Sequence, residues 1–146
     1  MTDDVSTTRR ARATFDVVGW DPGVPPSGEG APSGPLHSTA VVSKEFRGDL
    51  TGTSVADLLM CQANAADLAA GAGYIASERV DGALEGREGT FVLHHWGVSV
   101  EDARETGGHV VPGSATGELE GLQGQVRISV NERGDHTLTL DYELPS

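Results

Sequence analysis

The chain has 146 residues, the length of one ordinary domain with its own core. Acidic residues outnumber basic ones by 22 to 10, and the net charge of -12 argues against nucleic acid or an anionic membrane surface as a partner. No apolar run approaches the roughly 18 residues of a membrane-spanning helix. The lone Cys61 excludes an internal disulfide and is typical of a reducing compartment, so we expect a cytoplasmic protein.

Composition and chain order predict a single all-β domain. The 20 glycines and 7 prolines favour many short elements over a few long helices. We expect a flexible N-terminal tail at residues 1–12 and one domain at 13–146. Residues 21–36 are rich in proline and glycine and predict a loop, either a lid or a disordered segment.

Alternating apolar residues predict most of the strands. In the first strand a period of two places Phe15 and Val17 on one face, and Val18 and Trp20 on the other. Such patterns predict strands at 13–20, 38–46, 106–111, 125–130 and 137–144. Between the second and third of these, residues 53–70 favour a helix by propensity alone, because they are rich in alanine and leucine.

A β-hairpin is predicted at residues 73–97. Two runs with β-branched and aromatic residues flank a Gly-Arg-Glu-Gly turn at 86–89. The first arm carries Glu78 and Arg79, and the second carries His94 and His95. This hairpin is therefore the first place to look for a chemical site.

A G-x-L-x-G repeat begins at Gly48, Gly82 and Gly117, at nearly equal intervals. Such glycines mark bends where a curved sheet turns a corner. Three evenly spaced bends indicate a sheet that closes on itself.

Five motifs in order resemble the bacterial family named "domain of unknown function 3224". They are Phe-Arg-Gly-Asp-Leu-Thr-Gly at 46–52, Glu-Arg-Val-Asp-Gly at 78–82, Gly-Thr-Phe-Val-Leu-His-His at 89–95, Val-Pro-Gly-Ser-Ala-Thr-Gly-Glu-Leu at 111–119, and Asp-Tyr at 141–142. The resemblance implies a closed antiparallel β-barrel of about eight strands, similar to plant allene oxide cyclase. It also implies a strand, not a helix, at 53–62.

Glu78 and His95 are the candidate catalytic residues. The resemblance favours them as recurrent polar positions, and we expect both to point into the barrel. A buried carboxylate has a raised pKa and can act as a general acid or base, with the histidine shuttling or orienting the proton. The similarity to allene oxide cyclase implies a cyclase or isomerase, although whether the chain is an enzyme stays open. The alternative is that Glu78 belongs to a structural polar network.

A small eight-stranded barrel can hold one small ligand, and we expect a hydrophobic one inside it, bound without a cofactor. The candidate lining residues are apolar or aromatic: Met60, Tyr74, Phe91, Leu93, Trp96 and Tyr142. The alternative is a non-catalytic interaction module whose barrel is filled by its own side chains. Either form is expected to be a homo-oligomer, a dimer or trimer.

No metal site is expected. His94 and His95 are neighbours on one strand and point to opposite faces, so they cannot share an ion unless a bulge intervenes. The remaining histidines, at 37, 109 and 136, show no short ligand spacing.

Overall fold

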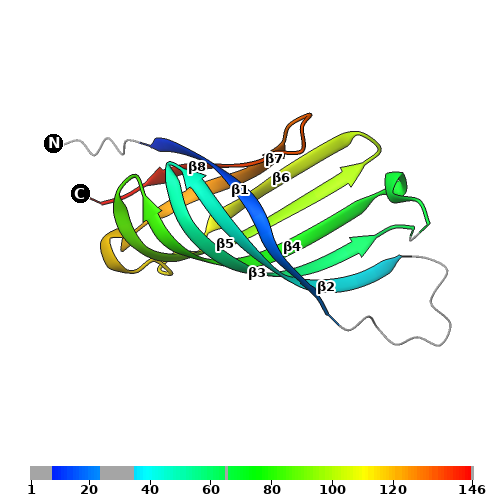
Figure 1. Cartoon of the computed structure of the whole chain (residues 1–146), viewed down its shortest axis with the longest axis horizontal. Helices are drawn as coiled ribbons and strands as arrows, with labels where there is room; N and C mark the ends of the chain where they lie inside the picture. Colours follow the sequence, from blue (N-terminus) through cyan, green and yellow to red (C-terminus); the bar gives the residue numbers. More distant parts are fainter. Residues whose placement is uncertain (1–7, 24–34, 65, 146) are drawn as a thin grey trace.

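Eight antiparallel strands close into a barrel in the computed structural model, which describes residues 8–23, 35–64 and 66–145 (Figure 1). Each strand pairs with its neighbours in chain order, and the last pairs with the first. The strands are β1 (Arg9–Pro22), β2 (Leu36–Gly48), β3 (Leu50–Gln62), β4 (Ala72–Leu84), β5 (Arg87–Val100), β6 (Ala103–Val110), β7 (Gln123–Val130) and β8 (His136–Glu143). Two short 3-10 helices, η1 (Leu68–Ala70) and η2 (Gly117–Leu119), lie in connections. The predicted all-β barrel is confirmed.

Two segments have a different structure from the one expected. Strand β1 begins at Arg9, so residues 9–12 belong to the barrel and not to a tail. The helix favoured by propensity at residues 53–70 is wrong, because most of that segment is β3. The expected lid or disorder at 21–36 falls mainly on residues 24–34, which lie outside the described part of the chain.

Strand β3 forms because tertiary pairing outweighs its local propensity. Its backbone pairs with β2 on one side and with β4 on the other, along nearly its whole length. Leu50, Ser54 and Ala56 alternate inward and are buried, while Val55 and Leu59 face outward. An inward row and two flanking ladders stabilise the extended backbone more than helix propensity opposes it.

The three G-x-L-x-G copies lie at one end of the barrel, which we call the leucine end (Figure 1). The copies form the β2–β3 turn, the β4–β5 turn and η2 in the β6–β7 connection. Leu50, Leu84 and Leu119 are 1%, 1% and 0% exposed and belong to one apolar cluster. The repeat therefore marks three connections whose leucines plug the same end of the barrel.

The β4–β5 turn is centred on Glu85 and Gly86. The predicted turn, at residues 86–89, lay further along the chain and ended at Gly89. Both central residues have positive φ, 48° and 88°, as a two-residue type I′ turn requires. Gly89 lies instead within β5, directly opposite Gly82 of β4. Gly82 in turn lies opposite Gly52 of β3, so three glycines form a row across adjacent strands.

A β-bulge in β1 changes which face Trp20 occupies. The register with β2 shifts between Val17 and Gly19, so Val17 lies opposite Lys44 and Trp20 opposite Val42. Residues paired directly across an antiparallel ladder point to the same face. Trp20 therefore shares the inner face with Phe15, contrary to the regular alternation expected from the sequence.

The β6–β7 seam is the least paired part of the barrel. Its register contains a single residue pair, His109 with Gln125. The Thr106 hydroxyl supplements that pair by donating to the Ile128 carbonyl at 2.8 Å and accepting from the Ile128 N–H at 3.0 Å.

No helix in the described residues is long and apolar enough to cross a membrane.

Candidate functional site

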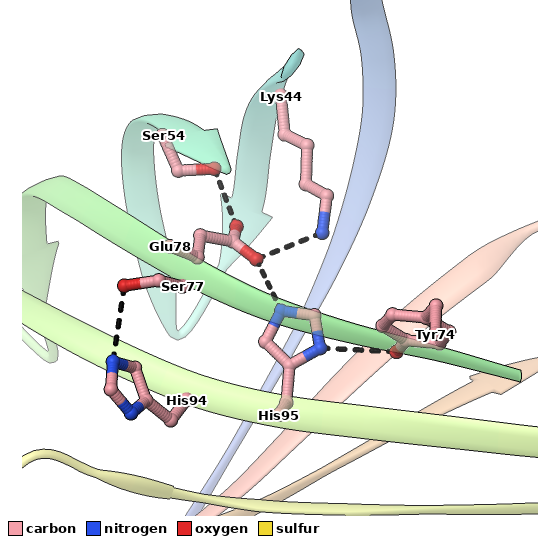
Figure 2. A network of polar contacts seen from close by, with 7 residues as sticks. All are labelled: Lys44, Ser54, Tyr74, Ser77, Glu78, His94 and His95. Carbon is pink, nitrogen blue, oxygen red and sulfur yellow. Dashed lines mark hydrogen bonds and ion pairs between the residues drawn. The ribbon is translucent and has the colours of Figure 1, made fainter. Parts of the chain in front are cut away.

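Five polar side chains from four strands meet inside the barrel, and we call them the interior network (Figure 2). Lys44 lies on β2, Ser54 on β3, Tyr74 and Glu78 on β4, and His95 on β5. Four of them are almost fully buried, with exposures of 6% for Lys44, 3% for Ser54, 0% for Glu78 and 4% for His95. Each occupies an inward position in its strand's alternation, which is why strands distant in sequence bring them together.

Glu78 is the centre of the interior network. Its Oε1 lies 3.0 Å from Lys44 Nζ and 2.7 Å from His95 Nε2, and its Oε2 accepts a 2.5 Å hydrogen bond from the Ser54 hydroxyl. Lys44 Nζ also lies 4.5 Å from the centre of the Phe15 ring, a cation–π contact. No buried side-chain polar atom among the described residues lacks a hydrogen-bond partner.

The carboxyl group of Glu78 is strongly acidic, which corrects the expectation of a raised pKa. Burial acts to raise its pKa, but the hydrogen bond from His95 and the charge of Lys44 outweigh it. Together with the Ser54 hydrogen bond, they hold the pKa of Glu78 at about 2. Glu78 is therefore an anion at neutral pH and a poor general acid.

Tyr74, His95 and Glu78 form a chain of hydrogen bonds. The Tyr74 hydroxyl lies 3.0 Å from His95 Nδ1, and the two rings meet edge to face with centres 5.5 Å apart. A neutral imidazole protonated at Nε2 satisfies both contacts, since it donates to Glu78 and accepts from Tyr74. Burial, and the nearby charge of Glu78, raise the pKa of Tyr74 to about 12, so the hydroxyl keeps its proton. Glu78 thus fixes the tautomer of His95, and His95 orients Tyr74.

The interior network divides the inside of the barrel along its axis. On the leucine side of the network lies the apolar cluster that includes Phe46 of β2, Val80 of β4 and Leu93 of β5. On the other side the inward residues are smaller and lie outside that cluster: Ala40, Val42, Ala56 and Ala76. We call the half with these residues, opposite the leucine end, the upper half.

Apolar side chains in the upper half are partly exposed. Leu58, Met60 and Tyr74 face inward and are half-buried, and the inward Trp20 is 56% exposed. The upper half therefore combines small buried residues, a partly exposed apolar rim and the polar end of Tyr74. Such a surface suits an apolar molecule that carries one hydrogen-bonding group.

The six predicted lining residues fall into three places. Phe91, Leu93 and Tyr142 are 1%, 0% and 2% exposed and pack in the apolar cluster, in the filled half of the barrel. Met60 and Tyr74 lie on the inner face of the upper half. Trp96 lies on the outer face, 36% exposed, because it follows the inward His95 on the same strand.

Sequence reasoning missed Lys44, Ser54 and Trp20. Lys44 follows Val42 and precedes Phe46 at period two, so its inward position was readable from the alternation of β2. Its pairing with Glu78 was not readable, because that depends on the register of three strands. Trp20 was missed because nothing in the sequence marks the bulge beside it.

Within residues 8–23, 35–64 and 66–145, no group of three or more histidine, cysteine, aspartate or glutamate side chains is placed to hold a metal ion. His94 faces outward, and its Nε2 lies 3.1 Å from the Ser77 hydroxyl. His94 and His95 therefore lie on opposite faces of β5, as predicted (Figure 2).

Comparison with known proteins identifies the family. A search of curated proteins finds no match. Among solved structures, the barrel is similar to a protein of unknown function from the DUF3224 family of Shewanella oneidensis MR-1, solved by crystallography at 1.84 Å resolution. The two share 30% sequence identity and a TM-score of 0.81 over 96% of this chain and 99% of that one. The family model described as "Protein of unknown function (DUF3224)" matches residues 11–142, and this chain therefore belongs to that family.

Proposed function

We propose that the upper half of the barrel binds a small apolar molecule and that Tyr74 recognises one polar group on it. The observation that carries this proposal is the partly exposed apolar rim, formed by Leu58, Met60 and Trp20, beside a buried polar network. Apolar side chains that face the inside of a barrel and remain partly exposed favour an apolar occupant. The Tyr74 hydroxyl is the member of the network nearest this rim, and its oxygen can accept a further hydrogen bond.

If the bound molecule reacts, Tyr74 and His95 are the groups able to move its proton. Glu78 is fully buried and stays ionised, so its role is to hold the His95 tautomer. A cyclase or isomerase reaction would then use Tyr74 as a general base: its oxygen takes a proton from the bound molecule while its own hydroxyl proton passes to His95 Nδ1, and the reverse transfers return both protons. This assignment transfers the acid–base role from Glu78 to the Tyr74–His95 pair.

The test measures binding of the neutral fluorescent probe N-phenyl-1-naphthylamine. It uses a Trp96→Phe background, so that Trp20 is the remaining tryptophan and energy transfer from it to the probe reports on binding in the upper half. Leu58 and Leu59 are neighbours that face inward and outward. We expect Leu58→Gln to weaken binding by roughly tenfold, about the effect of 1.4 kcal/mol of lost apolar contact, and Leu59→Gln to leave it unchanged. Equal effects of the two changes, or no energy transfer, would contradict the proposal.

A second comparison separates recognition by Tyr74 from general packing. Tyr74→Phe removes only the hydroxyl that meets His95, whereas Tyr142→Phe removes a hydroxyl that donates to Glu85 at the leucine end. We expect Tyr74→Phe to weaken binding of the probe several-fold, in line with about 1 kcal/mol for a hydrogen bond. Tyr142→Phe should leave binding of the probe unchanged. If Tyr142→Phe weakened binding and Tyr74→Phe did not, the polar contact with the probe would not be made by Tyr74.

The alternative function, an interaction module, is favoured by a different observation. Leu59, Ile75 and Trp96 lie directly opposite one another on β3, β4 and β5. They are 56%, 56% and 36% exposed and form an apolar row on the outer face. Next to the row, Arg79 and Asp57 form an ion pair at 3.5 Å.

The occupant that fits this outer row is a second copy of the chain. A two-fold axis there would set the apolar row and the Arg79–Asp57 pair of one copy against those of the other, so that charges of both signs meet despite the net charge of -12. Sedimentation equilibrium of wild type and Ile75→Lys distinguishes the outcomes, with Val130→Lys on β7 as the control. We expect a dimer that only Ile75→Lys dissociates, and a monomeric wild type would refute self-association.

A further inference from the structure

The outer face carries a polar row that runs across six neighbouring strands. Register places Ser77 opposite His94, His94 opposite His109, His109 opposite Gln125, Gln125 opposite Asp141, and Asp141 opposite Arg10. Most of this row lines a groove of about 1180 Å³ on the outer surface. It lies on the opposite side of the sheet from the interior network and takes no part in the proposed function.

We propose that His94 and His109 form a binding site for a divalent transition-metal ion. The two residues lie directly across from each other on β5 and β6, and both are exposed. Side chains in such a pair have β-carbons about 4.5–5.5 Å apart. Two imidazoles at that separation can both place a nitrogen about 2.0–2.1 Å from one ion.

The contact between His94 and Ser77 prepares His94 as a ligand. Its Nε2 lies 3.1 Å from the Ser77 hydroxyl, so the N–H can donate there and the lone pair is left on Nδ1. Figure 2 shows Nδ1 on the side of the ring away from Ser77, and β6 flanks β5 on that side. Metal-ligating histidines commonly donate their other N–H in this way, which fixes the tautomer.

The composition of the site selects the class of ion. Two imidazoles leave the remaining positions to water, and nitrogen ligands favour Cu²⁺ over Zn²⁺ and Ni²⁺ in the usual order of affinities. The net charge of -12 also attracts cations to the surface. Sequence spacing could not find this pair, because the two residues are brought together only by the β5–β6 register.

Trp96 supplies a nearby optical signal. It lies two residues after His94 on the same face of β5, and its ring covers Gly107, two residues before His109 on β6. A β-carbon added at Gly107 would come within 2.8 Å of Trp96 Cζ2, so the indole lies directly against β6. A bound Cu²⁺ ion would therefore quench Trp96.

The experiment is a titration with CuCl₂ in a Trp20→Phe background, which leaves Trp96 as the only tryptophan. We expect saturable quenching with one ion per chain. Losing a residue that supports a metal ligand typically weakens metal binding by roughly 10–100-fold. We expect Ser77→Ala to weaken Cu²⁺ binding by roughly tenfold, and we expect the loss of either ligand, by His94→Ala or His109→Ala, to weaken it by roughly 10–100-fold. His37→Ala, which removes an exposed histidine on β2, should have no effect.

Zn²⁺ provides a second readout, because it binds the same ligands more weakly than Cu²⁺ and has no redox chemistry with which to quench, so a large excess should displace Cu²⁺ and restore the fluorescence. Quenching that survives either His94→Ala or His109→Ala would refute a shared site. Quenching that does not saturate would also overturn the proposal. So would a His37→Ala control that weakens Cu²⁺ binding as much as His94→Ala or His109→Ala does.

Discussion

Lys44 and Glu78 form a buried pair of opposite charges. Both charges are almost fully removed from water, and burial of this kind is compensated only while every partner is present. Removing one charge leaves the other buried and unpaired. The pair therefore specifies the inside of the barrel more than it adds net stability.

We expect Glu78→Gln to lower the free energy of unfolding by about 3–5 kcal/mol, because Lys44 keeps an uncompensated buried charge. Adding Lys44→Met should restore at least half of that loss, since the glutamine can still meet Ser54 and His95. Urea denaturation of wild type, both single variants and the double variant gives the coupling energy. Losses that simply add would show that the two charges do not interact.

The pH dependence of stability follows from the same carboxyl group. Its folded pKa of about 2 lies below its ordinary value of 4.5, so its contribution is complete above about pH 5 and is lost as the pH falls toward 2. The shift corresponds to about 3 kcal/mol. The stability difference between wild type and Glu78→Gln should shrink by about this amount across that range, and a constant difference would contradict the lowered pKa.

For single residues, the sequence predicted which face of a strand a side chain occupies better than it predicted which side chains it contacts. Alternation grouped Glu78 and His95 with apolar neighbours on one face of each strand, and the family resemblance predicted that both point inward. The ionisation of Glu78 depends on Lys44 and Ser54, which lie on other strands, and it came out opposite to expectation. The catalytic roles of Glu78 and His95 stay predictions.

At the scale of elements, glycine sets how closely the strands approach near the leucine end. A β-carbon at Gly82 would lie 1.9 Å from the Thr51 carbonyl oxygen, and one at Gly89 would lie 2.1 Å from that of Thr116. Neither contact can be relieved by moving a side chain, because both atoms belong to the backbone. The row of Gly52, Gly82 and Gly89 therefore has a steric cause.

We expect Gly82→Ala and Gly89→Ala each to lower the melting temperature by several degrees or more, because overpacking typically costs about 1–3 kcal/mol. Gly73→Ala is the matched control, since its β-carbon would have ordinary contacts beginning at 3.5 Å. That control should be neutral or slightly stabilising. Differential scanning calorimetry measures all three, and equal effects would rule out the steric explanation.

The repeat and the strand pattern made most of the elements predictable. The G-x-L-x-G copies predicted three bends of a closed sheet, and all three lie at connections of the leucine end. Strand β3 was not predictable from propensity, since its pairing with β2 and β4 decides its conformation. The bulge in β1 was also unpredictable, and with it the inward position of Trp20.

For the whole molecule, the β6–β7 seam limits how firmly the barrel stays closed. Thr106→Val keeps the shape of the side chain and removes both hydrogen bonds to Ile128. We expect this change to lower the free energy of unfolding by about 1–3 kcal/mol, and we expect the backbone amides of β7 to exchange faster than those of β4. Hydrogen exchange by NMR tests this, with Thr139→Val on the fully paired β8 as control. Uniform exchange across the barrel would show that the seam opens only on global unfolding.

The pairing of β1 with β8 also governs how the chain reaches this structure. Every other ladder joins consecutive strands, whereas this one joins Arg9 to Tyr142 and closes a loop of nearly the whole chain. Closing a longer loop costs more entropy, so this ladder should form after the folding barrier.

Chevron plots can test that order of events. We expect Leu140→Ala, in the β1–β8 ladder, mainly to accelerate unfolding, and Val80→Ala, in the β4–β5 hairpin, mainly to slow folding. The opposite assignment would place closure of the barrel before the barrier. If closure is late, the lifetime of the native barrel depends on its last ladder, and the rate of folding depends on its central hairpins.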